Sequence, residues 1–174
     1  TNTSLDLIQE QMKRLSTECN ETCHLGILTG NEIMYLLKIS TTNPIQLISS
    51  VGKRLPAYAT ALGKALLLDK SINELEELFP TPFKAFTAQT IKSPIDLYND
   101  IHNNNSFTYE NEEITNHACC IALPIREDGK IVAALSVSFL TFTTSSEKVL
   151  KIKKELLKSA SIIERIIKNK GFSY

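Results

Sequence analysis

The chain has 174 residues, with 19 Lys and Arg against 19 Asp and Glu, 43% hydrophobic residues and four cysteines. This length suits one domain of ordinary size. The composition excludes a disordered chain, and no apolar run approaches the roughly 20 residues that a membrane span needs. The net charge of zero argues against nucleic-acid binding by this chain alone, because phosphate binding needs a basic surface.

The charge is unevenly distributed along the chain. Residues 66–128 carry eleven acidic and four basic side chains, whereas residues 146–170 carry eight basic and three acidic ones. A basic stretch can contact nucleic acid, but at helical spacing it is more often the solvated side of a helix. We therefore predict a solvated face for residues 146–170.

The first fifty residues predict a helix followed by three strands. The helix covers residues 5–19, with Ser4 as its cap, and its apolar residues recur at helical spacing. Strands are predicted at residues 22–28 and 33–39, joined by a turn that contains Gly30. A third strand is predicted at residues 45–49, after Pro44.

Three helices are predicted in the middle of the chain. The Ala- and Leu-rich run after Pro56 favours a helix that continues to Leu68. A second helix covers residues 72–78. A third begins with Ser93 as its N-cap and Pro94 as its first residue, and it extends to about His102.

The last third of the chain predicts strands and a closing helix. The strands cover residues 107–109, 119–125 and 131–139, and a turn at residues 127–130 joins the last two as a hairpin. A long helix follows, capped by Thr144, Ser145 or Ser146, with one apolar stripe. Two antiparallel strand groups flank a helical middle, which indicates an α+β domain with one sheet and helices packed on it.

Catalytic and metal-binding motifs are weak. The chain has no Gly-rich phosphate loop, no Gly-x-Ser-x-Gly elbow and no His-Glu-x-x-His. Four cysteines at this density suit reduced thiols in a cytoplasm. The possible zinc ligands match no familiar finger or ribbon spacing, so we predict neither a metal nor another cofactor. These ligands are Cys19, Cys23, His24, His117 and Cys119.

One region has the features of a small-molecule site. Residues 60–63 open a predicted helix, and the small residues among them leave backbone N–H groups accessible to a carboxylate. Ser136 and Ser138 alternate on one face of their strand, and Cys120 and Ala122 alternate likewise on the partner strand. The alternative is that these are merely small residues under a packed helix.

Several segments resemble the IclR family of bacterial transcription regulators, and together they cover nearly the whole chain. They are VGKRLPAYATALGKALL at residues 51–67, TAQTI at 87–91, FTYENEE at 107–113, CIALPI at 120–125 and AALSVS at 133–138. The family joins an N-terminal winged helix-turn-helix domain to a C-terminal effector-binding domain with a GAF-like (profilin-like) fold. The resemblance implies that residues 1–20 are the linker helix from an N-terminal domain missing here, and that residues 21–174 are the effector-binding domain.

The resemblance also implies a ligand and its pocket. The family's effectors are small carboxylates, typically keto, hydroxy or sugar acids. The implied pocket consists of the backbone amides of Ala61 and Leu62 and the side chains of Glu110, Cys120, Ser136 and Ser138.

The family's biology gives further expectations. The chain is most similar to regulators that respond to 2-keto-3-deoxygluconate, which implies a repressor in carbohydrate catabolism. We expect a cytoplasmic homodimer or homotetramer that binds operator DNA through the missing domain, changes operator affinity with effector, and has no contact with a membrane.

The chain departs from the family pattern at three positions. Glu110 stands where the family usually has Asp, so the acceptor reaches one methylene further. Ser106 and His117 stand where Gly is usual. His117 lies three residues before Cys120 and, if protonated, can contact a ligand anion at the pocket mouth; otherwise it is an ordinary loop residue.

Two other functions are compatible with the residues. Some GAF-like domains reduce methionine sulfoxide, which requires an activated thiolate and a resolving thiol. Cys120 is the candidate nucleophile here and Cys23 the candidate resolver, because Cys119 faces away on the same strand. The second alternative is a purely structural oligomerisation module.

Overall fold

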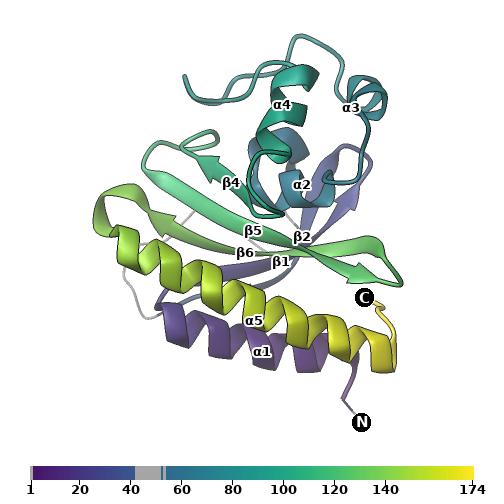
Figure 1. Ribbon diagram of the computed structural model, residues 1–174, viewed down its shortest axis with the longest axis vertical. Coiled ribbons are helices and arrows are strands. Elements are labelled where there is room, and N and C mark those ends of the chain that lie inside the picture. Colours follow the sequence, from purple (N-terminus) through teal and green to yellow (C-terminus); the bar gives the residue numbers. More distant parts are fainter. Residues whose placement is uncertain (1, 42–51, 53) are drawn as a thin grey trace.

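A six-stranded antiparallel sheet forms the centre of the molecule (Figure 1). The computed structural model describes residues 2–41, 52 and 54–174. The strands are β1 (Thr22–Thr29), β2 (Glu32–Ile39), β3 (Arg54–Pro56), β4 (Thr108–Asn111), β5 (Ala118–Glu127) and β6 (Lys130–Leu140). Their order in the sheet is β3-β2-β1-β6-β5-β4. The N-terminal strands β1–β3 therefore form one half of the sheet and the C-terminal strands β4–β6 the other, and the two halves meet where β1 pairs with β6.

Helices cover both faces of this sheet (Figure 1). One face carries the two longest helices, α1 (Ser4–Cys19) and α5 (Ser146–Lys170), which lie side by side. The other face carries the 3-10 turn η1 (Ala57–Ala59) and the helices α2 (Ala61–Leu66), α3 (Ile72–Leu78) and α4 (Pro94–Ile101). A second 3-10 turn, η2 (Thr141–Thr143), joins β6 to α5. The predicted α+β architecture with one antiparallel sheet is confirmed.

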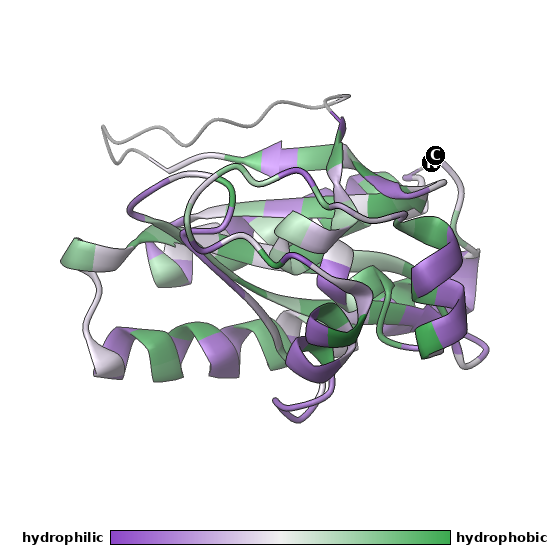
Figure 2. Cartoon of the chain, turned by 90° about the horizontal axis from the view of Figure 1, so that it is seen from above, coloured by the Kyte–Doolittle hydropathy of each residue, from purple (hydrophilic) through white to green (hydrophobic). Residues whose placement is uncertain are grey.

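The sheet separates two apolar cores. In Figure 2 green stretches run along the strands with pale and purple ones between them, and the helices alternate green and purple. The first core lies between the sheet and the α1–α5 pair. It buries the predicted α5 stripe of Ile152, Leu156, Ala160, Ile163 and Ile167, with Val149 partly buried. The second core lies beneath α2, α3 and α4. Alternate residues of each strand thus belong to different cores.

Several predicted boundaries need correction. Thr3, not Ser4, caps α1, because its hydroxyl accepts from the Asp6 N–H while the Asp6 carboxylate accepts from the Thr3 N–H. The helix predicted after Pro56 is divided at Thr60, whose extended backbone ends η1 and begins α2. The short strand β3 was not predicted, and the strand predicted at residues 45–49 lies outside the described residues.

The basic stretch of α5 faces solvent, as predicted. Most of its cationic side chains are exposed on the side away from the sheet, and Lys148 forms an ion pair with Glu21 at 2.9 Å. Among the described residues, no helix combines the length and the apolar character that crossing a membrane requires.

Candidate functional site

A cavity of about 250 Å³ lies between the start of α2 and the sheet. It is lined by apolar residues and by a small number of polar ones, as ligand pockets usually are. All six residues predicted for the site line this cavity: Ala61, Leu62, Glu110, Cys120, Ser136 and Ser138. Their geometry is therefore as expected, while their role toward a ligand stays a prediction.

Strand register explains why residues distant in sequence meet here. Glu110 on β4 lies opposite Cys120 on β5, which lies opposite Ser138 on β6. In the adjacent row, Ser136 on β6 lies opposite His24 on β1. Because side chains alternate between the two faces, both rows point to the face that α2 covers. The sheet thus presents a continuous polar strip to the cavity.

The start of α2 is fixed by Thr60 and Gly63. The Thr60 hydroxyl accepts the Gly63 N–H at 2.9 Å, and the Thr108 hydroxyl donates to the Ala61 carbonyl oxygen at 2.7 Å. A Cβ on Gly63 would lie 2.1 Å from the Ala57 carbonyl oxygen, so only glycine allows α2 to pack this closely against η1. Ala61 and Leu62 occupy the first two helical positions, where an N–H has no acceptor within the helix.

Glu110 is the buried acid of the cavity, with 2% of its surface exposed. Its Oε2 accepts the Glu113 N–H at 2.8 Å. Burial raises the pKa of Glu110 to about 7, and the nearby Glu113 carboxylate acts in the same direction. Glu110 therefore carries a proton in a large fraction of molecules at neutral pH, and it can donate as well as accept.

This raised pKa predicts a pH dependence of stability. Since the folded chain holds the Glu110 proton more tightly than the unfolded chain, the contribution is full below about pH 4.5 and is lost as pH rises through about 7. We expect the fall to reach about 3 kcal/mol. Glu110→Gln should remove this fall, measured as the difference between the two proteins in unfolding free energy from urea titrations at pH 4.5 and 8. Parallel pH profiles for both proteins would contradict the assignment.

Cys120 lacks the environment of a reactive thiol. Burial and the neighbouring Glu110 raise its pKa, and its Sγ lies 3.0 Å from the Ser138 hydroxyl. Cys119 and Cys23 belong to the core on the opposite face of the sheet. The thiol-enzyme alternative therefore has neither a stabilised thiolate nor a resolving thiol on the cavity side.

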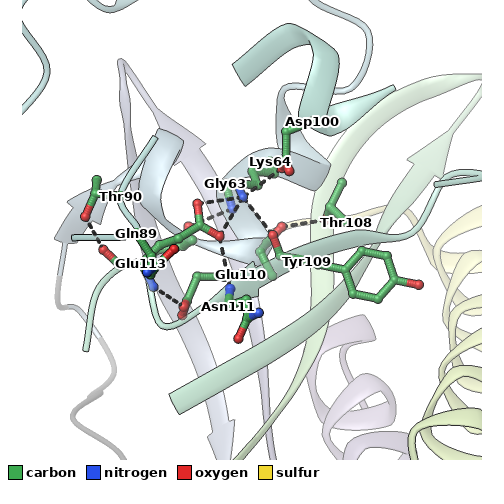
Figure 3. Close-up of polar contacts among 12 residues, drawn as sticks. Gly63, Lys64, Gln89, Thr90, Asp100, Thr108, Tyr109, Glu110, Asn111 and Glu113 are labelled. Carbon is green, nitrogen blue, oxygen red and sulfur yellow. Dashed lines mark hydrogen bonds and ion pairs between the residues drawn. The ribbon is translucent and has the colours of Figure 1, made fainter. Parts of the chain in front are cut away.

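A buried lysine cluster next to the cavity was not predicted (Figure 3). Lys64 of α2 is fully buried, and its Nζ contacts Glu113 at 2.9 Å and Asp100 of α4 at 2.8 Å. It also donates to the Tyr109 carbonyl oxygen at 2.7 Å. This cluster ties α2 to α4 and to the segment between β4 and β5. The signal in the sequence was a lone lysine inside an Ala- and Leu-rich run.

The segment after β4 is held by a second set of contacts. The Thr87 hydroxyl donates to the Glu112 carbonyl oxygen, and the Thr90 hydroxyl donates to the Glu113 carbonyl oxygen. Residues 114–116, which line the cavity, follow directly. The TAQTI run at residues 87–91 therefore supports one cavity wall.

Two aromatic residues of the cavity were also missed. His24 and Tyr35 lie on β1 and β2 with their ring centroids 4.8 Å apart, and both line the cavity. Burial lowers the pKa of His24 to about 3, so the ring is neutral at physiological pH. Only the pairing of β1 with β6, which sequence periodicity does not reveal, brings His24 beside Ser136.

His117 does not belong to the cavity lining in the described structure. Its side chain is largely exposed, and its backbone N–H donates to a Glu112 carboxylate oxygen. Ser106 and His117, where the resembled pattern has glycine, adopt left-handed φ values of 73° and 68°. Glycine adopts this conformation without strain, so the backbone conformation explains why the resembled pattern usually has glycine at these two positions.

The possible zinc ligands are dispersed. Cys19, Cys23 and Cys119 lie in the first core, His24 lines the cavity, and His117 is on the surface. Within the described part of the chain, no group of three or more His, Cys, Asp or Glu residues could hold a metal ion.

Comparison with known proteins gives consistent matches. The family model described as bacterial transcriptional regulator IclR C-terminal matches residues 4–165. The HTH-type transcriptional regulator KdgR of Dickeya chrysanthemi is 34% identical over 151 residues, which cover 83% of this chain and 50% of that protein. The chain spans about half the length of the curated relatives it matches.

Two solved structures are also similar. The C-terminal domain of E. coli KdgR has a TM-score of 0.84 at 30% identity, covering 95% of this chain and 98% of that one. An IclR homolog from Microbacterium hydrocarbonoxydans, solved in complex with 4-hydroxybenzoate, has a TM-score of 0.83 at 25% identity, covering 97% of this chain and 70% of that one.

Proposed function

The chain belongs to the IclR family of bacterial transcription regulators, and we propose that its cavity binds a small carboxylate, such as a sugar acid or a keto acid, as the effector. Its structural neighbours are IclR C-terminal domains, so the predicted GAF-like fold is confirmed. Its homologues are named as transcription regulators, not as enzymes. The chain is accordingly the effector-binding part of such a regulator.

The observation that carries this proposal is the polar strip inside a buried cavity. Ser136 and Ser138 are almost fully buried, yet both hydroxyls line an open volume of about 250 Å³. Hydroxyl and amide donors bind a carboxylate by charge-assisted hydrogen bonds, and apolar walls strengthen these bonds by excluding water. A purely structural oligomerisation module does not require a cavity lined in this way, so the lining favours ligand binding.

The named relatives support an organic acid as the ligand class. The sequence resemblance to regulators that respond to 2-keto-3-deoxygluconate favours a sugar acid, and an IclR homolog solved in complex with 4-hydroxybenzoate shows that a related protein holds an aromatic acid. The direct experiment is isothermal titration calorimetry of the 174-residue chain with D-gluconate, pyruvate and 4-hydroxybenzoate. Binding of at least one acid supports the proposal. No heat with any of these acids, together with no thermal shift, would favour the oligomerisation alternative.

For the whole regulator we propose an effector-dependent repressor of carbohydrate catabolism in the cytoplasm. In this mechanism a homodimer or homotetramer exists in two arrangements, and effector binding favours the one with altered operator affinity. An effector can shift such an equilibrium only by its differential affinity for the two arrangements. We expect a coupling free energy of about 1–3 kcal/mol, and DNA contact through an N-terminal helix-turn-helix domain.

Ser138→Ala tests the predicted pocket. We expect this variant to bind the acid more weakly by roughly 1.5–3 kcal/mol, because one charge-assisted hydrogen bond is lost. The exposed Ser161 of α5 provides the matched control, and Ser161→Ala should bind as the unaltered chain does. Calorimetric affinities of the three proteins compare them directly. Equal affinity of Ser138→Ala and the control would place the ligand elsewhere.

A further inference from the structure

The cavity offers an anion no full positive charge. Among its lining residues in the described part of the chain, none is lysine or arginine, and the one histidine, His24, is neutral at physiological pH. Its ionisable acid, Glu110, is itself buried. An ionised Glu110 would repel a bound carboxylate in surroundings of low dielectric constant, where charge repulsion is strong. The charges around Glu110 therefore decide how an anion is accommodated.

Lys64, the cation whose charge acts on Glu110, is already paired with other groups. Lys64 has three N–H donors, and its three partners are the Tyr109 carbonyl oxygen, Glu113 and Asp100. The cluster already pairs two carboxylates with one ammonium group before Glu110 is counted. A third carboxylate charge, on Glu110, would add to this negative excess.

The groups that face Glu110 from the surrounding elements are few. Lys64 lies on α2, Glu113 follows β4, Cys120 lies on β5 and Tyr35 lies on β2. Of these, Lys64 favours the ionised form of Glu110, whereas Glu113 opposes it. The partly buried Cys120 thiol and the buried Tyr35 phenol are neutral, since removal from water raises the pKa of each.

We propose that the cavity takes up its anionic effector together with one proton, which Glu110 holds and through which it donates a hydrogen bond to the effector's carboxylate. This inference rests on the proposed function and adds the protonation state of the bound complex. The proton comes from solvent, and no bond to the effector is made other than hydrogen bonds. Protonated Glu110 then offers the effector a hydrogen-bond donor, whereas ionised Glu110 would offer it a negative charge. A Gln at position 110 would supply a neutral donor at every pH.

Calorimetry across pH tests this proposal with the acid that binds most tightly among D-gluconate, pyruvate and 4-hydroxybenzoate. If only the protonated site binds, the Kd should be about thirtyfold weaker at pH 8.5 than at pH 6. At pH 7, the apparent enthalpy should differ between PIPES and imidazole buffers, as proton uptake requires. Glu110→Gln should bind with a Kd that changes less than twofold over this range, whereas the control Glu77→Gln, at an exposed position of α3, should follow the unaltered chain.

The possible failures are distinguishable. Binding that does not depend on pH, or that strengthens as pH rises, would overturn the proton-linked mode and leave the effector site standing. Loss of all binding in Glu110→Gln, with the fold intact by circular dichroism, would also overturn it, because the amide retains a donor. No binding of any acid by the unaltered chain would overturn the proposed function itself.

Discussion

Lys64→Met is expected to lower the unfolding free energy by about 3–5 kcal/mol, because it leaves a buried carboxylate without its cation. Lys64 is fully buried, and the Glu113 side chain, 2.9 Å from its Nζ, is only 9% exposed. Methionine retains the length of the stem but donates no hydrogen bond, so the Tyr109 carbonyl oxygen also loses its lysine donor. Urea unfolding at pH 7, monitored by circular dichroism, measures the change.

An exposed ion pair provides the control. Lys13 and Glu10 lie 3.3 Å apart on the surface of α1, and Lys13→Met should change stability by less than about 1 kcal/mol. The loss of unfolding free energy caused by Lys64→Met should also be smaller at lower pH, because protonation of Glu113 removes its unpaired charge. Equal effects of the two substitutions would mean that the buried cluster contributes no more than a surface pair.

Gly63→Ala is expected to destabilise the domain by about 3 kcal/mol or more, the upper range for overpacking. The added Cβ would lie 2.1 Å from the Ala57 carbonyl oxygen and 2.4 Å from the Ala57 Cα. Both are backbone atoms of η1, so no side-chain rotation relieves the contact. Either η1 or the start of α2 must move, and α2 forms one wall of the cavity.

The control for this substitution is a glycine with room around it. Gly129 lies in the β5–β6 turn with a φ of 79°, and an added Cβ would meet no atom within 4 Å. Gly129→Ala should therefore cost only the backbone strain of about 1–2 kcal/mol. Thermal unfolding of both variants compares them. If Gly63→Ala were no less stable than Gly129→Ala, the close packing of η1 on α2 would be wrong.

Elements with local signals were predicted well. The apolar spacing of α5, the Ser93–Pro94 start of α4 and the glycine turn between β5 and β6 all depend on neighbours in the sequence. The missed features depend on contacts across the chain. Strand β3 has three residues and includes Pro56, so its pairing with β2 leaves no periodic signal.

The candidate site shows the same division between local and distant information. Ser136, Ser138 and Cys120 could be chosen from strand alternation, because side chains two residues apart share a face. Lys64 and Glu113 are 49 residues apart in sequence, and nothing local to either predicts their ion pair. His24 joins the site only through the β1–β6 register. The buried ion pairs beside the cavity and the position of His24 were thus the features least accessible to sequence reasoning.

The central claim is that a small organic acid binds between α2 and the polar strip of the sheet. An NMR titration of the ¹⁵N-labelled chain with D-gluconate, pyruvate or 4-hydroxybenzoate tests it most directly. We expect the largest amide shifts at Ala61, Leu62, Glu110, Cys120 and Ser138, all of which line the cavity. Shifts confined to the surface around Arg126 and Lys168, with none at these five amides, would contradict the account.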